Sequence, residues 1–473
     1  MPSVFPVNDF GPLMPGLFIG AIAVLHVFLA QFAVGGGFLL CYFQWLGMSG
    51  IEPHAKAFVK GYFKVLVLVS FVVGAVTGVG VWFATIQVSS PTIGSMVGNF
   101  HWFWGIEYTF FFLEIVSGYL FYRYQDELAD WASLTLLGIY SFAAWMSLFW
   151  INGIISWQLT PGDWLATHSA WDGFFNPSFW PSLFFRTIVS LTLASLGACL
   201  VINFMAEFRR HARRMLINRA AHFLGPMILM PLLAIWYLRV IPEESQRWVM
   251  GGSPAMTMFF TLAIGASLAI GVYSIVGLLG QRMYINGATA GLLLFLAFGA
   301  TAGGEFVREG SRKPFSIRDH LYSDGVGVDE VARMRRAGAT ADDPYPLPIA
   351  TREKMPNEQV ALGAKVYRRL CSTCHTIDGA NPLRELTAAW DETQMRLNIA
   401  KLQQTKAFMP PFAGNARDVE AVVQFLNWRK AGSPKYWKES VAPEIFAQIA
   451  HWLDEAGVEP ATMSSRTGRP LKE

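Results

Sequence analysis

Charged residues and cysteines are both scarce in this chain. Asp, Glu, Lys and Arg make up only 15% of its 473 residues, against about 25% in soluble domains, so the chain is not expected to lie wholly in water. Its formal net charge is only +3, which argues against nucleic-acid binding. Two of its four cysteines, Cys41 and Cys199, lie in long apolar segments and are predicted to be buried packing residues. No second cysteine pair is therefore available to complete a zinc site.

The other two cysteines stand close together in Cys371-Ser372-Thr373-Cys374, and His375 follows at once. This spacing is the attachment signature of c-type haem, in which two thiols bond to the porphyrin edge and the imidazole reaches the iron. A Cys-x-x-Cys pair can also be a redox dithiol or half of a zinc site, but a thioredoxin-like motif needs a βαβ pattern that the surrounding sequence lacks. The motif predicts one-electron transfer in a compartment outside the cytoplasm, where c-type haem is attached.

A second ligand for the same iron is predicted at Met409. It lies in a proline-rigid loop, Phe408-Met409-Pro410-Pro411-Phe412, and a thioether on the far face of the iron raises the potential of a cytochrome c. The alternative role of a lone methionine is core packing. An amphipathic helix is expected at 418–428, and the segment 355–452 resembles a class I cytochrome c over its whole length.

Long apolar runs fill the chain before residue 305, and hydrophobic residues reach 53% of the sequence. About 20 apolar residues can span a bilayer. The first run carries no short apolar core with a cleavage site, so it is expected to be a retained helix and not a removed signal. The eight predicted spans are 13–45, 58–85, 103–122, 131–157, 180–205, 222–238, 255–279 and 283–306.

Basic residues in the loops orient this bundle. The loops after the first, third, fifth and seventh spans carry Lys or Arg, whereas those after the second and fourth carry none. By the positive-inside rule the odd loops are cytoplasmic, and both termini then lie outside. The haem motif independently requires the C-terminal domain outside, so the sequence predicts a bacterial inner-membrane protein with that domain on the periplasmic side. The basic residues are Lys56, Lys60, Arg123, Arg209, Arg210, Arg213, Arg214, Arg219 and Arg282.

The predicted fold is all-α, with a polytopic transmembrane bundle of about eight spans followed by a small all-α cytochrome c domain. The predicted parts are a transmembrane haem domain at 1–315, a charged and proline-rich linker at 316–354, a cytochrome c domain at 355–458 and a polar tail at 459–473. Within the linker, residues 342–348 are expected to form a semi-rigid proline spacer.

Ionisable residues inside a span are costly and suggest function. His26 lies in the first span, Glu107 and Glu114 share one face of the third, and Arg186 lies in the fifth. A charged stretch, 304–315, ends the eighth. Each residue also has a structural alternative. A membrane histidine can simply bond a neighbouring helix, and a buried glutamate can be a protonated hydrogen-bond donor.

The charged stretch resembles the eighth helix of subunit I of the cytochrome bd oxidases, which reads G-W-F-V-A-E-Y-G-R-Q-P-W. Residues 304–315 align with it without a gap. The resemblance implies that Glu309 ligates a high-spin haem and that Arg312 neutralises nearby charge. The structural alternative for Glu309 is an ion pair with Arg308 or Arg312. The matching residues are Gly304, Phe306, Val307, Glu309, Arg312 and Pro314.

Two further segments are similar to this family. The first helix of the family has a histidine before a segment ending L-G-x-x-F-L-L, and His26 precedes residues 35–40, which read GGGFLL. His26 is thereby implied to hold the other high-spin haem. The third helix of the family reads I-E…F-F-L-E and matches here at Glu107 and Glu114 with one residue fewer between them. Glu107 is implied to lie at the haem pair or to pass protons.

The chain departs from the family at the low-spin haem. Aligning 184–190 with the family's F-V-H-T-V-A-S places Arg186 at the histidine that holds this haem, and a guanidinium cannot ligate iron. The methionine position in the seventh helix falls near Thr261, and the long quinol-binding loop is here only 241–254. The chain is expected to lack the low-spin haem and the quinol site, and Arg186 is expected to neutralise a haem propionate or another buried acid.

The sequence therefore predicts a membrane haem oxidoreductase that takes electrons through the periplasmic haem c into two bundle haems of b or d type and reduces O2. Glu107, Glu309 and Arg312 are the candidate catalytic residues. The expected partners are a second bd-like membrane subunit, a c-type cytochrome or other periplasmic donor, and the lipid bilayer, with no nucleic acid. Two alternatives stay open: a non-catalytic electron-transfer subunit of a larger respiratory complex, and a membrane anchor whose bundle holds no haem.

Overall fold

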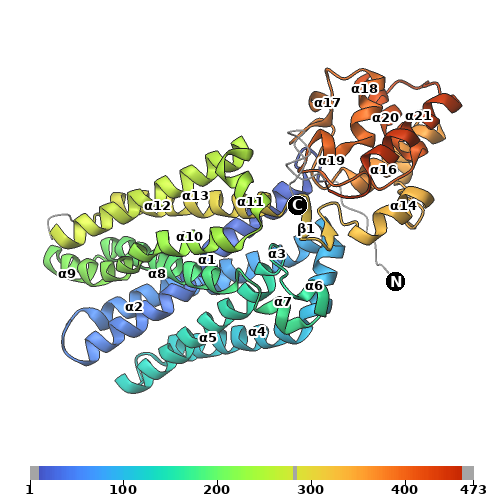
Figure 1. Ribbon diagram of the computed structural model, residues 1–473. Coiled ribbons are helices and arrows are strands. Elements are labelled where there is room, and N and C mark those ends of the chain that lie inside the picture. The colour runs from blue at the N-terminus through green and yellow to red at the C-terminus, as the bar shows by residue number, and fades with distance from the viewer. Residues whose placement is uncertain (1–9, 281–284, 461–473) are drawn as a thin grey trace. The chain divides into compact units, whose positions relative to one another are not determined.

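The computed structural model describes residues 10–280 and 285–460, which fold into two compact units (Figure 1). Among these described residues, unit 1 comprises 10–21, 82–95 and 312–460, and unit 2 comprises 22–81, 96–280 and 285–311. The predicted all-α class is confirmed, with a bundle of long apolar helices and a small helical C-terminal domain. Arg282, the first residues of the predicted eighth span and residues 461–473 of the predicted tail lie outside the described residues.

Seven helical spans among the described residues are long and apolar enough to cross a membrane. They are Pro15–Met48, Ala55–Val88, Asp130–Ser156, Phe179–Phe204, Arg210–Val240, Pro254–Gly277 and Gly287–Arg312. Their helices are α1 (Pro15–Met48), α2 (Ala55–Leu66), the π-helix η1 (Val67–Gly74), α3 (Ala75–Val88), α5 (Asp130–Ser156), α8 (Phe179–Phe204), α9 (Arg210–Ala221), the 3₁₀ helix η2 (His222–Leu229), α10 (Met230–Val240), α12 (Pro254–Gly280) and α13 (Gly287–Arg312). Seven of the eight predicted spans therefore correspond to apolar membrane-length helices.

The remaining predicted span, 103–122, lies in α4 (Ser90–Tyr124), a helix of 35 residues that kinks at Phe100. Its two glutamates and other polar residues make it less apolar than the seven spans. A short turn joins α4 to α5, and the Phe100 ring contacts that of Trp157, just beyond the other end of α5, at 5.1 Å between centroids. Because α4 thus runs antiparallel along the whole of α5, it packs in the bundle beside the seven apolar spans.

The loops that follow α1, α4, α8 and α12 meet at one end of unit 2. Their contacts are the ion pairs of Lys56 with Asp130 and of Lys60 with Asp126, the ring contact of His54 with Phe208, and the hydrogen bond from Asn203 to the carbonyl of Ile285. Successive helices of unit 2 therefore alternate in direction. This alternation is the arrangement that the predicted topology requires.

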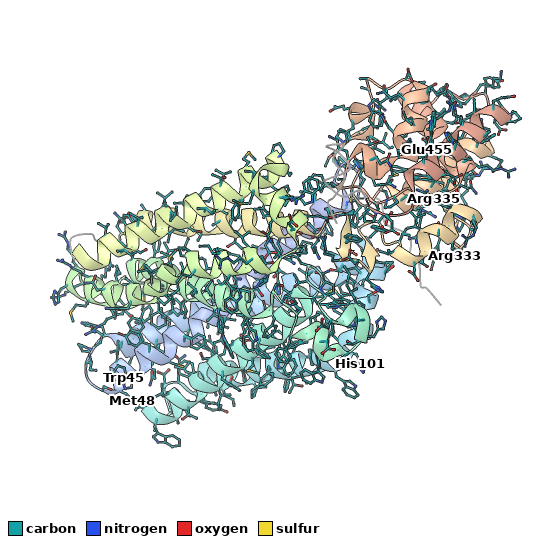
Figure 2. The ribbon with its side chains drawn as sticks, viewed as in Figure 1. Trp45, Met48, His101, Arg333, Arg335 and Glu455 are labelled. Carbon is teal, nitrogen blue, oxygen red and sulfur yellow. The ribbon has the colours of Figure 1, made fainter. Side chains whose placement is uncertain are left out.

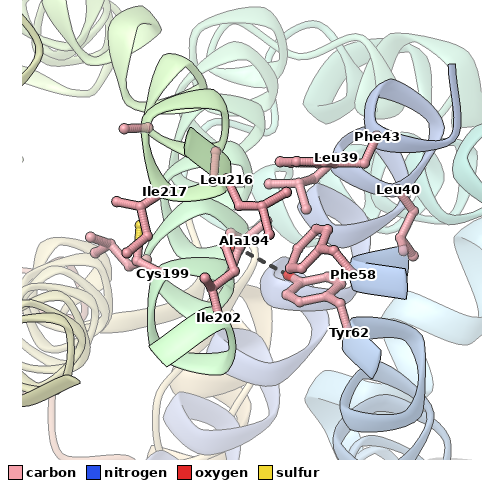
Figure 3. Packing of buried hydrophobic residues seen from close by; sticks show 14 of the residues in the cluster. Leu39, Leu40, Phe43, Phe58, Tyr62, Ala194, Cys199, Ile202, Leu216 and Ile217 are labelled. Carbon is pink, nitrogen blue, oxygen red and sulfur yellow. Dashed lines mark hydrogen bonds between the residues drawn. The ribbon is translucent and has the colours of Figure 1, made fainter. Parts of the chain in front are cut away.

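Aromatic and aliphatic side chains fill the core of unit 2 (Figure 3). The fully buried Tyr62 packs on Phe58 and donates its hydroxyl hydrogen bond to the carbonyl of Ala194, 3.1 Å away, which satisfies its polar end. Backbones approach closely where α1 crosses α8, because a Cβ at Gly35 would lie 1.9 Å from the carbonyl oxygen of Ser190. Small residues at such crossings are typical of membrane bundles. Cys199 is fully buried and Cys41 packs against the same core.

Shorter elements connect these helices and build unit 1. Between the long helices of unit 2 lie α6 (Trp164–Thr167), α7 (Ala170–Phe174), α11 (Glu243–Arg247) and the π-helix η3 (Trp248–Gly252). In unit 1 an antiparallel hairpin of β1 (Phe315–Ile317) and β2 (Leu321–Tyr322) precedes η4 (Val328–Glu330), α14 (Val331–Ala337), α15 (Ile349–Arg352), α16 (Glu358–Leu370), α17 (Leu383–Leu386), α18 (Glu392–Ala400), α19 (Leu402–Thr405), α20 (Ala416–Lys430) and α21 (Pro443–Ala456).

Two crossing helices, α16 and α20, form the centre of the C-terminal domain. Gly363 lets them touch, since a Cβ there would lie 2.0 Å from the carbonyl oxygen of Ala421. Asn415 caps α20 by accepting hydrogen bonds from the first turn. Burial alone would raise the pKa of Glu420, but hydrogen bonds from neighbouring side chains, above all Arg396 of α18 at 2.6 Å, hold it below its usual range. This buried ion pair ties α18 to α20.

Replacing Arg396 with methionine is expected to destabilise the C-terminal domain by about 3–5 kcal/mol, because the fully buried Glu420 loses its counter-charge. The midpoint of urea unfolding, followed in the full-length protein by haem c absorption, measures this change. Arg352→Met is the control, since Arg352 pairs with the exposed Glu358 and should contribute less than about 1 kcal/mol. Equal midpoints for both variants would contradict the structural role of the buried pair.

Candidate functional site

The predicted haem-attachment motif forms a single tight turn at the end of α16. The backbone N–H groups of Cys374 and His375 both donate to the carbonyl of Cys371, at 3.2 and 3.0 Å. The Tyr367 hydroxyl, from the last turns of α16, donates to the carbonyl of His375 at 2.8 Å. Both thiols are free of disulfides. Two free thiols and an imidazole on one turn fit the donor set that a covalently attached haem requires.

Asn381 orients the imidazole of His375, a role that sequence reasoning missed. The Nδ1 atom of His375 lies 3.2 Å from the carbonyl oxygen of Asn381, which can only accept a hydrogen bond. The side-chain amide nitrogen of Asn381 lies 3.1 Å from the same Nδ1 atom, so both described contacts of the ring fall on Nδ1 and Nε2 stays available to a metal. Burial lowers the pKa of His375, which keeps the ring neutral as ligation demands. Asn381 has a φ of 51°, a left-handed conformation that asparagine tolerates.

A carboxyl group lies beside the motif on the strand-to-helix segment of unit 1. Loss of water around Asp324 raises its pKa to about 6, although the charges of Arg369 and Lys313 oppose this shift. The Cys371 thiol is likewise desolvated, and the nearby Asp324 adds to the effect, so the pKa of Cys371 rises to about 12. The thiol is therefore protonated at neutral pH. Sequence reasoning gave no signal for Asp324, since only the fold brings it to the motif.

The loop of Met409 is held in place by distant parts of unit 1. Met409 is half-buried, and its backbone N–H donates to Lys406 at 2.9 Å. Arg335 of α14 (Figure 2) donates to the carbonyls of Phe412, at 3.1 Å, and of Leu453 in α21, at 2.5 Å. The segment expected to be a linker thus fixes the loop that carries the predicted second ligand. Arg335 was also missed, because its partners are far away in the sequence.

In unit 2, His26 lies against the second span. Its Nδ1 atom is 3.2 Å from both the carbonyl oxygen of Gly74 and the hydroxyl oxygen of Thr77. Both of these hydrogen bonds use Nδ1, so the described contacts leave Nε2 available to a metal. Metal-ligating histidines commonly donate their other ring N–H to a carbonyl in this way. The donor set at His26 therefore fits a haem ligand.

The two glutamates of α4 are arranged as their spacing predicts. Glu107 accepts a hydrogen bond of 2.5 Å from the hydroxyl of Ser147 in α5. Glu114, two turns further, is buried at 7% exposure beside Tyr140, and the two carboxyl groups are close enough to interact. Both side chains therefore face α5 from one side of α4.

Arg186 is bound to an acid that sequence reasoning did not single out. Its guanidinium lies 3.4 Å from one carboxylate oxygen of Glu305, and Arg308 lies 2.7 Å from the other. The three side chains are largely buried and join α8 to α13. An acidic partner for Arg186 was expected, and Glu305 takes that place in the structure. The sequence signal that could have identified Glu305 was its position in the charged stretch 304–315.

The two residues that the resemblance places at the end of α13 are in different surroundings. Glu309 belongs to unit 2 and is exposed in the chain alone, whereas Arg312 belongs to unit 1 and is only 7% exposed. Arg312 donates to the carbonyl of Ser316 at 3.5 Å. Glu305 and Arg308, one turn earlier, form the buried charge cluster of this helix.

Comparison with known proteins agrees with this two-part organisation. Residues 358–426 match the family model of cytochrome C oxidase, cbb3-type, subunit III, which confirms the predicted cytochrome c domain and implies a covalent haem c. The membrane region is similar in fold to the bd oxidase from Geobacillus thermodenitrificans, with 15% sequence identity, a TM-score of 0.57, and coverage of 65% of this chain and 89% of that one. This likeness confirms the predicted fold of the bundle. No curated protein sequence matches the chain.

Replacing Met409 with alanine is expected to lower the reduction potential of haem c by on the order of 100 mV, because a thioether ligand favours the ferrous state. A spectroelectrochemical titration of the full-length protein measures the change. Met355→Leu serves as control, since Met355 only packs against the core of the same domain. A potential that is unchanged in Met409→Ala would show that the thioether of Met409 is not an iron ligand.

Proposed function

We propose that this multi-pass membrane protein takes electrons from a periplasmic donor through its haem c and passes them to haems held in the bundle, where O2 is reduced. The cytochrome c domain and the bd-like membrane fold support a role in membrane haem electron transfer or oxidase chemistry. In unit 1, Cys371 and Cys374 would attach haem c, and His375 and Met409 would hold its iron. Haem supplies the one-electron chemistry, and the residues supply ligands, orientation and charge.

The hydrogen bonding of His26 is the observation that carries this proposal. A histidine that only joined two helices could use either ring nitrogen. Here both described hydrogen bonds converge on Nδ1, so Nε2 keeps the lone pair that iron needs. We propose His26 as the ligand of one bundle haem and Glu309 as that of a second, of b or d type. Glu107 is proposed to lie at the haem pair or to pass protons, and Arg312 to balance charge.

The Arg186–Glu305 ion pair supports the proposal that the bundle lacks a low-spin haem. Arg186 occupies the position at which the family carries an iron-binding histidine, and its guanidinium is tied to Glu305 of α13. The segment between α10 and α12 contains only the short α11 and η3, so the long quinol-binding loop of the family has no counterpart in it. Both features support electron entry from a c-type cytochrome or another periplasmic donor instead of quinol.

The proposed setting is a bacterial inner membrane, with both termini and the cytochrome c domain on the periplasmic side. The alternating helix directions of unit 2 gather the loops after α1, α4, α8 and α12 at one end. The Lys and Arg residues that follow α1, α4 and α8 support a cytoplasmic location for that end. A second, bd-like membrane subunit is the proposed partner within the bilayer.

A second candidate function is a non-catalytic electron-transfer subunit, and the exposure of Glu309 favours it. An exposed carboxylate on α13 does not by itself enclose a haem. On this alternative, a partner would complete the site, or the chain would relay electrons without reducing O2. The two functions differ in whether a bundle iron has an open coordination position.

His26→Ala is expected to remove one bundle haem per chain and to leave the c-type spectrum intact, because only the bundle haem depends on this imidazole. Pyridine haemochrome analysis counts both kinds of haem in the purified protein. His101→Ala is the matched control, since His101 is an exposed histidine of α4 (Figure 2). Full haem retention in His26→Ala would refute the ligand assignment, and a preparation with haem c alone would leave only a membrane anchor.

CO added to the dithionite-reduced protein is expected to shift the absorption of a bundle haem, because an oxidase needs an open iron site for O2. The difference spectrum should be smaller by at least half in His26→Ala if that residue holds one of two reactive haems. No change on adding CO would remove the oxidase function and favour the electron-transfer subunit.

A further inference from the structure

The second span is irregular where it passes His26. Between α2 and α3 the chain forms the π-helix η1, and Gly74 is its last residue. A π-helical turn shifts the backbone hydrogen bonds by one residue, so carbonyl groups beside it can turn to other donors, and such turns often lie at functional sites. The buried Gly74 carbonyl accepts a hydrogen bond from the Thr77 hydroxyl, at 3.0 Å, and lies 3.2 Å from Nδ1 of His26.

These contacts determine which nitrogen of His26 carries the proton. The carbonyl oxygen of Gly74 can only accept, so Nδ1 must be the donor in this pair. The Thr77 hydroxyl lies 2.8 Å from the carbonyl of Val73 and 3.0 Å from that of Gly74. Its one proton goes to these carbonyls, so its oxygen meets Nδ1 as a second acceptor at 3.2 Å. Two acceptors on Nδ1 favour the tautomer whose Nε2 is unprotonated.

Gly78 lets the ring lie against the helix. A Cβ at this position would be 3.0 Å from Cε1 and 3.6 Å from Nε2 of His26. A contact of 3.0 Å is tighter than most contacts of a Cβ atom, so with a methyl group at this position the imidazole would have to move away by a few tenths of an ångström. Because Gly78 lies one turn after Gly74, the glycine and the two hydrogen-bond acceptors face His26 together.

We propose that Gly74, Thr77 and Gly78, the His26 cradle, are positioning residues that set the tautomer and the direction of His26 so that Nε2 meets a haem iron. This inference rests on the proposed ligand role of His26 and adds the residues that make it possible. The cradle acts through His26 and need not touch the haem. Haem binding is therefore expected to fail when a cradle residue is substituted, even though His26 itself is retained.

Thr77→Val is the first test, because it replaces the hydroxyl with a methyl group of similar size. The expected result is a 10- to 100-fold weaker retention of the bundle haem, the usual effect of losing a partner of a metal-ligating histidine. Retention is measured by the bundle-haem absorption that remains during dialysis against apomyoglobin in detergent, with haem c as the internal standard. Thr77→Ser keeps the hydroxyl and should restore retention to within about twofold of the parent protein.

Gly78→Ala is a second and independent test. The added methyl should displace the ring, remove the bundle haem that depends on His26, and leave haem c unchanged. Gly80→Ala is its matched control on the same helix, since a Cβ at Gly80 would lie at an ordinary 3.5 Å from a methyl carbon of Ile22. If Thr77→Val also lowers the haem c content, the variant is misfolded. The comparison of Gly78→Ala with Gly80→Ala then tests the cradle.

The results separate this inference from the proposed function. Loss of the bundle haem in His26→Ala, Thr77→Val and Gly78→Ala, with retention in Thr77→Ser and Gly80→Ala, supports the cradle. Loss in His26→Ala alone, with parental retention and an unchanged bundle-haem spectrum in the two cradle variants, overturns the cradle and keeps the ligand. Full retention in His26→Ala overturns both.

Discussion

A polar group in the hydrocarbon core of a membrane must find its partner within the protein, and this requirement organises the bundle. Water is not there to satisfy a charge or a hydrogen-bond donor, so an unpaired group costs several kcal/mol. Three interior ionisable groups of the bundle have a partner on a different helix. His26 of α1 meets Gly74 of η1, Arg186 of α8 meets Glu305 of α13, and Glu107 of α4 meets a serine of α5. The same contacts set how the helices face one another, so the residues proposed for function also hold the bundle together.

The cytochrome c domain positions its proposed haem-binding residues differently. Cys371, Cys374 and His375 lie on one turn, so their relative positions follow from local backbone geometry. Met409 depends instead on the fold, because Arg335 ties its loop to the segment before the domain. A covalent attachment can be built from a local motif, whereas the opposite face of the iron needs a residue brought from elsewhere.

This difference explains what could be predicted from the sequence. The haem motif could be predicted because its residues lie on one turn, so their spacing in the sequence fixes their relative positions. The spans could be predicted because apolar runs of membrane length rarely form anything else. The predicted span 103–122 lies within the longer helix α4, and its two glutamates share one face as their spacing predicted. The residues that contact these functional side chains could not be predicted. Asn381 contacts the imidazole of His375 only because of a turn, and Glu305 contacts the guanidinium of Arg186 only because of the helix register. The π-helical turn that ends at Gly74 has no distinctive composition.

The arrangement at the end of α13 also bears on the choice between two carboxylates. Glu305 and Glu309 lie one turn apart, and both would be reasonable iron ligands by residue type. Glu305 binds two guanidinium groups through its two oxygens. Using it as a ligand would break both contacts and leave two largely buried positive charges without their shared counter-ion, which is strongly unfavourable. The two guanidinium groups and one carboxylate carry one net positive charge, so under the proposed function this cluster would attract a haem propionate more readily than an iron. Glu305 is therefore poorly suited to hold an iron, and Glu309 stays the proposed ligand on this helix.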